Sequence, residues 1–170
     1  FANPAQVFTD TTLIIEPTGT DINGDNIDYN YDWYVDGGLV QSGNQNTLDG
    51  LLFFAKGQAV QVTATPSDGI ADGAMYTSAP VTVLNSPPTA PVVSLGGDFI
   101  HDDYNLICQI LTPSVDPDAD PITYEFILEG DGSPPTYGQY TSNYLNDSVN
   151  AVATDIASDW VCNVQPDDGT

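Results

Sequence analysis

The sequence predicts an all-β protein built from two tandem antiparallel β-sandwiches that a Pro-rich linker joins. Three observations support this prediction: short segments alternate apolar and polar residues, turn residues separate these segments, and an Asp-rich motif occurs twice. The 170 residues include 13 Pro and 15 Gly, which favours many short strands connected by tight turns. No apolar period of 3.6 residues is sustained anywhere, so we expect no long helix.

The Asp-rich motif occurs at two places that lie 95 residues apart. It reads Asp-Ile-Asn-Gly-Asp at residues 21–25 and Asp-Pro-Asp-Ala-Asp at residues 116–120, and a Tyr follows each copy at the same distance. A Pro-x-Asp-Gly turn also recurs, at residues 66–69 and, 100 residues later, at 166–169. Self-similarity of this kind indicates a repeat architecture. We therefore expect two homologous units.

Alternation and turns locate the strands of the first unit, residues 1–87. Residues 29–35 place Tyr, Tyr, Trp and Val on one face and predict a half-buried strand, and residues 60–64 and 81–84 follow the same pattern. A shorter apolar strand is expected at residues 13–15. Gly-containing turns separate these strands at residues 36–38, 42–44, 67–69 and 72–73.

The linker and the strands of the second unit, residues 88–170, follow in order. Residues 87–91 contain three Pro, which hold the backbone extended and stiff. Strands are expected at residues 92–95, 105–110 and 159–164. The second unit stops before an equivalent of the strand at 81–84. We expect either that the chain is a window on a longer polypeptide or that a neighbouring molecule supplies the strand.

In their order and spacing, these motifs resemble tandem immunoglobulin-like repeats. The resemblance rests on residues 21–25, 27–37, 66–69 and 81–88, and it covers nearly the whole chain. Such repeats, related to cadherin-like and PKD-like modules, occur in very large secreted and surface proteins of bacteria and archaea. The resemblance implies extracellular structural or adhesive work, often with calcium, and no catalysis. The second unit fits less well, because it has Phe-Ile-Leu at residues 126–128 where the first has Tyr-Asp-Trp.

The resemblance also suggests a role for the two cysteines, Cys108 and Cys162. In an immunoglobulin-like sandwich the second and penultimate strands lie in opposite sheets and face each other across the core. The matching positions in the first unit are Leu13 and Val62, which are both apolar. This implies a Cys108–Cys162 disulfide and an oxidising compartment, with two buried free thiols as the alternative. Core packing is expected for Trp33, its counterpart Leu128, and Trp160.

The two Asp-rich motifs suit a hard cation, because alternate oxygen-bearing side chains in a tight loop converge on one point. The expected ligands are Asp21, Asn23 and Asp25 for the first site, and Asp116, Asp118 and Asp120 for the second. Further ligands are expected from the Pro-x-Asp-Gly turns: Asp68 and Asp168, with Asp28 and Asp167 as weaker candidates. Calcium is favoured over Mg²⁺, which rarely accepts dedicated protein cages, and over zinc, which needs His or Cys. The alternative is that these are ordinary solvated turns.

The two loops differ at the fourth residue of the motif. Gly24 permits a sharp turn, whereas Ala119 is less permissive, so a strained turn or a different loop geometry is expected there.

The charge of the chain excludes several classes of partner. The sequence has one Lys, no Arg and 24 acidic residues, for a formal charge of −23. No basic patch for nucleic acid or an anionic membrane surface can be built from one Lys. No stretch of 18 apolar residues is present, so we expect no membrane insertion. Adaptation to salt, or simple solubility, is the alternative explanation of the acidity.

The expected function is therefore a non-catalytic, calcium-rigidified structural or adhesive segment of an extracellular or cell-surface protein. Its expected partners are neighbouring repeats or other surface proteins and glycans. One alternative is an accessory carbohydrate-binding module, with Tyr137, Tyr140 and Tyr144 as stacking residues. Another is a filament subunit, a homopolymer that strand donation completes.

Two isolated features carry little weight. His101 lies next to two Asp, but no activated Ser is placed for a catalytic triad, so we expect an exposed loop residue. Residues 146–148 form a glycosylation sequon in an expected loop.

Overall fold

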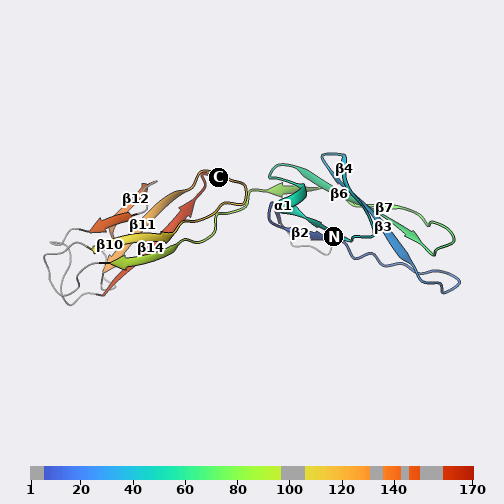
Figure 1. Ribbon diagram of the computed structural model, residues 1–170, viewed down its shortest axis with the longest axis horizontal. Coiled ribbons are helices and arrows are strands. Elements are labelled where there is room, and N and C mark those ends of the chain that lie inside the picture. The colour runs from blue at the N-terminus through green and yellow to red at the C-terminus, as the bar shows by residue number, and fades with distance from the viewer. Residues whose placement is uncertain (1–5, 97–105, 131–135, 143–145, 150–158) are drawn as a thin grey trace. The chain divides into compact units, whose positions relative to one another are not determined.

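The computed structural model of the chain describes residues 6–96, 106–130, 136–142, 146–149 and 159–170. These residues form strands, with one four-residue helix among them, so the all-β prediction is confirmed. Contacts along the chain separate two compact units, Phe1–Ser86 and Pro87–Thr170 (Figure 1). Residues 85–91, between the last strand of unit 1 and the first strand of unit 2, lie outside any helix or strand.

Unit 1 contains a large sheet and a two-stranded sheet. The large sheet has the order β1-β8-β6-β3-β4, and β7 pairs with part of β6. Its strands are β1 (Val7–Phe8), β3 (Asp28–Val35), β4 (Gly38–Gly43), β6 (Ala59–Ser67), β7 (Tyr76–Thr77) and β8 (Val81–Leu84). The second sheet pairs β2 (Thr12–Ile14) with β5 (Thr47–Asp49). All pairings are antiparallel except that of β1 with β8.

The core of unit 1 lies where these two sheets meet. Leu13 on β2, Trp33 on β3 and Val62 on β6 are all fully buried in one apolar cluster. On β3 the apolar positions of the alternating pattern face this core, as the sequence predicts. The hairpin between β3 and β4 turns at Asp36 and Gly37, which both have positive φ (48° and 80°), as a tight two-residue hairpin requires.

The short helix α1 (Gly50–Phe53) is an element that the sequence pattern does not predict. Its first turn is capped by Asp49, whose carboxylate accepts the N–H of Leu51 at 3.1 Å. Gly50 is packed so closely against the backbone of Thr9 and Thr11 that a Cβ has no room. A single turn is too short for an apolar period to show.

Among the described residues, no helix is long and apolar enough to cross a membrane.

Unit 2 contains two three-stranded antiparallel sheets. One has the order β13-β10-β9 and the other β12-β11-β14. The first is formed by β9 (Val92–Gly96), β10 (Leu106–Thr112) and β13 (Asn146–Val149). The second is formed by β11 (Thr123–Gly130), β12 (Thr136–Ser142) and β14 (Trp160–Asp167).

One expectation for unit 2 is wrong. The sequon at 146–148 lies within β13 and not in a loop. Pairing with β10 decides the conformation there, because local β preference depends strongly on context. The stretch that holds Tyr137 and Tyr140 forms β12.

The central strands of the two units share one register. In unit 1, Tyr29 on β3 pairs with Pro66 on β6. In unit 2, Tyr124 on β11 pairs with Pro166 on β14. The same offsets of 95 and 100 residues that relate the sequence motifs therefore relate the strand partners.

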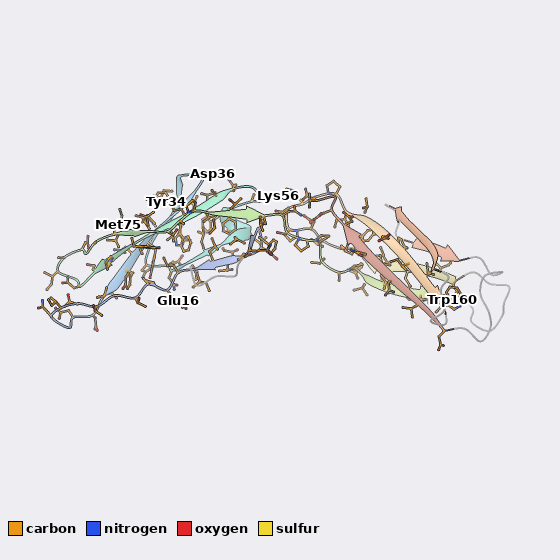
Figure 2. The ribbon with its side chains drawn as sticks, turned by 180° about the vertical axis from the view of Figure 1, so that it is seen from behind. Glu16, Tyr34, Asp36, Lys56, Met75 and Trp160 are labelled. Atoms are coloured by element: carbon orange, nitrogen blue, oxygen red, sulfur yellow. A yellow bond between two sulfur atoms is a disulfide. The ribbon has the colours of Figure 1, made fainter. Side chains whose placement is uncertain are left out.

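A disulfide between Cys108 and Cys162 joins the two sheets of unit 2 across its core, with 6.0 Å between the Cα atoms. Cys108 is fully buried on β10, and Cys162 lies on β14. Phe126 and Leu128 on β11 are fully buried beside it, so the core role of Leu128 is confirmed. Trp160 is half-buried and packs against this core from the start of β14, where Figure 2 labels it.

The two units differ at the outer edge of one sheet. In unit 1, β6 pairs with β3 on one side and with β7 and β8 on the other. In unit 2, among the described strands, β14 pairs with β11 alone.

Candidate metal centre

The two Asp-rich motifs form loops of the same local structure, between β2 and β3 in unit 1 and between β10 and β11 in unit 2. Asp21 Oδ1 accepts the N–H groups of Asn23 (2.6 Å) and Asp25 (3.2 Å). Asp116 Oδ1 accepts those of Asp118 (2.8 Å) and Asp120 (3.1 Å). In each loop the first Asp therefore fixes the backbone around its own side chain, as Asp commonly does in turns.

The fourth residue of each motif has positive φ. Gly24 has φ 85° and Ala119 has φ 61°. Their N–H groups donate to the carbonyls of Asp21 (3.3 Å) and Asp116 (3.2 Å) respectively. The second loop thus keeps the geometry of the first and accepts a left-handed Ala, which costs on the order of 1 kcal/mol. The structure selects the strained turn from the two outcomes expected for this loop.

A tyrosine hydroxyl approaches the start of each loop. In unit 2, Ser114 donates its N–H to the Tyr124 hydroxyl at 2.9 Å, and both residues are buried. In unit 1, the hydroxyl of Tyr29 lies 2.6 Å from the place where Gly19 would carry a Cβ. The Tyr that follows each motif in the sequence therefore packs against the loop, and Gly19 leaves room for it.

The loops differ in how deeply the first Asp is buried. Asp116 is only 9% exposed, whereas Asp21 is half-buried and its hydrogen bonds are solvent-exposed. The second oxygen of Asp116, Oδ2, is buried and has no hydrogen-bond partner among the described residues. A buried carboxylate oxygen without a partner is costly. This atom therefore requires a positively charged or hydrogen-bonding group that the described protein residues do not supply.

Asp116, Asp118 and Asp120 each place a carboxylate oxygen within 4.8 Å of the others. In the described part of the chain, no other group of three or more Asp, Glu, His or Cys side chains comes together in this way. Three carboxylates at this separation repel one another unless a cation lies between them. Oxygen ligands of this kind suit a hard divalent ion, and three carboxylates leave further ligand positions to carbonyls or water.

The turn residues Asp68 and Asp168 lie outside this group. Asp68 Oδ1 accepts the N–H groups of Ile70 and Ala71, both at 2.7 Å, and these bonds hold the pKa of Asp68 below its usual value. Asp168 Oδ1 accepts the N–H of Thr170 at 3.1 Å. Both Asp side chains thus stabilise their own turns, and Gly69 and Gly169 adopt the same φ (83° and 84°). Their role as metal ligands stays a prediction.

In unit 1, Asp21 and Asp68 line one hollow of about 790 Å³. The sequence predicts that the Asp-rich loop and the Pro-x-Asp-Gly turn lie at the same end of the sandwich, and both border this hollow. Asp28, a weaker candidate, is exposed at the start of β3 and does not line it.

The remaining candidate residues are Asp167, His101 and the three tyrosines of the possible sugar-stacking stretch. Asp167, the weaker candidate in unit 2, accepts the N–H of Gly169 at 2.6 Å. His101 and Tyr144 lie outside the described residues, as do the side chains of Tyr137 and Tyr140.

Sequence reasoning missed two residues beside the Asp116 loop. The Oγ of Ser114 is buried without a hydrogen-bond partner among the described residues. Thr89 accepts the N–H of Val115 through its hydroxyl and donates its own N–H to the Val115 carbonyl, both at 2.9 Å. No spacing in the sequence signals the Thr89–Val115 contact, because it depends on how residues 87–91 fold back beside the loop.

Comparison with protein-family models and with curated proteins finds no match for this chain.

Proposed function

We propose that the chain is a pair of immunoglobulin-like repeats that serve as a calcium-stabilised structural or adhesive segment of an extracellular or cell-surface protein. The observation that carries the proposal is the buried Oδ2 of Asp116, which lies in a cluster with Asp118 and Asp120. A divalent cation bound there supplies the missing partner and neutralises the three carboxylates.

The immunoglobulin-like assignment is supported by the sheets of unit 2. The disulfide connects β10 in one sheet with β14 in the other, at the positions where immunoglobulin domains join their sheets. The fully buried Trp33 on β3 occupies the position of the core Trp of such domains. The repeated register of the central strands supports a tandem relationship between the units.

The extracellular part of the proposal rests on the disulfide and the charge. Disulfides persist in oxidising compartments. With one Lys and no Arg, the chain offers almost no cleavage site to trypsin-like proteases, which suits a durable surface segment. A formal charge of −23 makes a compact state repel itself, and bound calcium reduces that repulsion.

A bound cation also acts on the backbone beside the site. Val115, which precedes Asp116, makes two hydrogen bonds with Thr89. Its N–H donates to the Thr89 hydroxyl, and its carbonyl accepts the Thr89 N–H. Fixing Asp116 to an ion therefore restrains the chain at the beginning of unit 2 as well as the loop itself. This is the proposed source of calcium-dependent stiffness.

The test is urea unfolding with calcium and with excess chelator, at fixed ionic strength. We expect calcium at 100 times its Kd to stabilise unit 2 by about 2.7 kcal/mol. Asp116→Asn abolishes most of this gain, whereas Asp21→Asn, which changes the matching residue of the more exposed loop, leaves unit 2 unaffected. Equal responses to calcium and to matched NaCl would refute the proposal.

One alternative has support from a specific observation. The outer edge of β14 has no partner among the described strands, whereas the matching edge of β6 is covered. A filament subunit in which a neighbour's strand pairs with this edge of β14 is the alternative proposal. Sedimentation over a hundredfold concentration range tests it: polymers that grow with concentration support strand donation, and a monomer throughout excludes it.

A further inference from the structure

The hollow in unit 1 is bordered by three separate segments of the chain. Residues 15–21 follow β2, residues 27 and 29 lie at the start of β3, and the third group belongs to the segment 64–76, which runs from β6 to β7. Figure 2 labels Glu16 on the first segment and Met75 on the last, and it places Lys56 toward the other end of the unit. The volume of about 790 Å³ is in the range of sites that bind a small molecule or several side chains of a peptide.

The charged groups of the hollow are all acidic. Glu16, Asp21, Asp68 and Asp72 line it, and no cationic side chain does. Asp21 and Asp68 each use one oxygen to accept backbone N–H groups. Glu16 and Asp72 both line the hollow, and both are exposed to solvent. Charge complementarity therefore demands a cationic occupant.

The remaining walls are apolar and aromatic. Tyr29 and Tyr76 line the hollow together with Ile27, Pro17 and Pro66. The ring of Tyr29 is fixed by stacking on Tyr31, with 6.3 Å between the ring centroids. Tyr76 on β7 is 64% exposed, so its ring is accessible to a partner. Aromatic faces beside carboxylates favour guanidinium over ammonium, because Arg stacks on rings and also pairs with carboxylates through two parallel hydrogen bonds.

The occupant cannot come from another copy of this sequence. The chain contains no Arg, and its single Lys donates a hydrogen bond to the Asn85 side chain at 3.1 Å. A second copy would also bring a formal charge of −23 to an acidic surface. The complementary partner is therefore a basic segment that lies outside this sequence.

We infer that the hollow of unit 1 binds an arginine side chain presented by an extended segment of a partner protein. The guanidinium pairs with exposed carboxylates of the hollow, Asp72 among them, and the apolar flanks of the segment contact Tyr76 and Pro66. This inference is independent of the proposed calcium centre, which belongs to unit 2. It gives the adhesive function a partner chemistry at a different site.

The experiment is an NMR titration of the chain in chelator with an acetylated, amidated pentapeptide, Gly-Val-Arg-Val-Gly. A counterpart with citrulline in place of Arg has the same shape without the charge. We expect the Arg peptide to shift amide signals of residues 15–21 and 66–76, and the citrulline peptide to bind at least about tenfold more weakly. A Lys peptide should bind about threefold more weakly than the Arg peptide.

Matched variants distinguish specific binding in the hollow from general electrostatic attraction to an acidic protein. Asp72→Asn and Tyr76→Ala should each weaken Arg-peptide binding about fivefold. Asp10→Asn removes the same charge from an exposed turn before β2, at the far end of that strand from the hollow, and should leave binding unchanged. Asp21 and Asp68 are left intact because their side chains shape the loops.

Several results would overturn the inference. Equal binding of the Arg and citrulline peptides would remove the charge argument. An equal loss of binding in Asp10→Asn and Asp72→Asn would show diffuse electrostatic attraction only. Shifts confined to unit 2 would locate the basic-peptide site elsewhere. In each case the calcium response of Asp116 would be unaffected, so the two proposals fail separately.

Discussion

Units 1 and 2 have the same strand register and the same Asp-loop backbone, but different interactions stabilise them. Unit 1 has a fully buried Trp33 and covers β6 on both sides. Unit 2 has Leu128 at the position that matches Trp33, and a disulfide between Cys108 and Cys162 joins its two sheets. The same backbone arrangement can therefore be stabilised between its sheets either by a large buried side chain or by a disulfide.

The same contrast applies to the acidic loops. Unit 2 buries Asp116 beside two further carboxylates, which favours a bound ion. Unit 1 leaves Asp21 half-buried on the rim of an open hollow, which favours a ligand with its own cationic group. We therefore propose different ligands for the two motifs, because burial sets the cost of a carboxylate oxygen that has no partner.

The largest expected effect comes from removing the disulfide. In the chain-entropy model, Cys108→Ala with Cys162→Ala lowers the free energy of unfolding of unit 2 by about 4 kcal/mol, since 54 residues separate the two cysteines. Unit 1, which contains no Cys, keeps its stability. Urea unfolding followed by amide signals of each unit measures this, and chemical reduction of the unaltered chain is the control. A similar loss in both units would mean that they do not unfold independently.

Introducing the same cross-link into unit 1 tests whether its two sheets face each other as those of unit 2 do. Leu13 and Val62 match Cys108 and Cys162 by the repeat offsets and are fully buried in one cluster. We expect Leu13→Cys with Val62→Cys to form a disulfide on oxidation and to stabilise unit 1 by about 2 kcal/mol, because lost apolar packing offsets part of the entropic gain. A thiol assay and urea unfolding check this against the reduced double variant. Free thiols after oxidation would show that the positions do not face each other.

Substitutions at the residues with positive φ in the two loops should have smaller effects, which differ in sign between the two units. Ala119→Gly relieves the strain at φ 61° and should stabilise unit 2 by about 1 kcal/mol. Gly24→Ala should destabilise unit 1 by a similar amount through the backbone alone, because no atom lies within 4 Å of the added Cβ. Thermal unfolding of both variants in chelator measures the pair. Changes of the same sign would show that side-chain contacts, and not backbone strain, control the loops.

The smallest expected effect is the pH dependence that Asp68 contributes to unit 1. Its two backbone hydrogen bonds lower its pKa in the folded state, so ionised Asp68 stabilises the fold above its unfolded pKa of about 4. This contribution is lost as the pH falls through the lowered pKa. Asp68→Asn should therefore flatten the acid side of the stability profile of unit 1 slightly. An unchanged profile between about pH 2 and pH 5 would contradict the assignment.

Part of this architecture could be predicted from local sequence patterns. Alternation along residues 29–35 is a property of neighbouring residues, so it predicted the buried face of β3 correctly. The repeat offsets depend on residue identity alone, and they paired Cys108 with Cys162 once the resemblance supplied the strand order.

The failures occurred where structure depends on distant neighbours. β13 forms because β10 pairs with it, although its own sequence was expected to form a loop. Helix α1 is a single turn held by its Asp49 cap and by close packing of Gly50, which no periodicity reveals.

For the candidate site, residue identity and spacing alone specified which side chains offer oxygen ligands. Asp116, Asp118 and Asp120 were identified as a possible cluster from their alternation, as were Asp21, Asn23 and Asp25. Burial came from the packed fold, in which Asp116 is buried with one oxygen unpartnered among the described residues, while Asp21 lines an open hollow. Spacing is a property of the chain, whereas burial depends on every segment that packs over the loop, and burial sets the free-energy cost of an uncompensated charge.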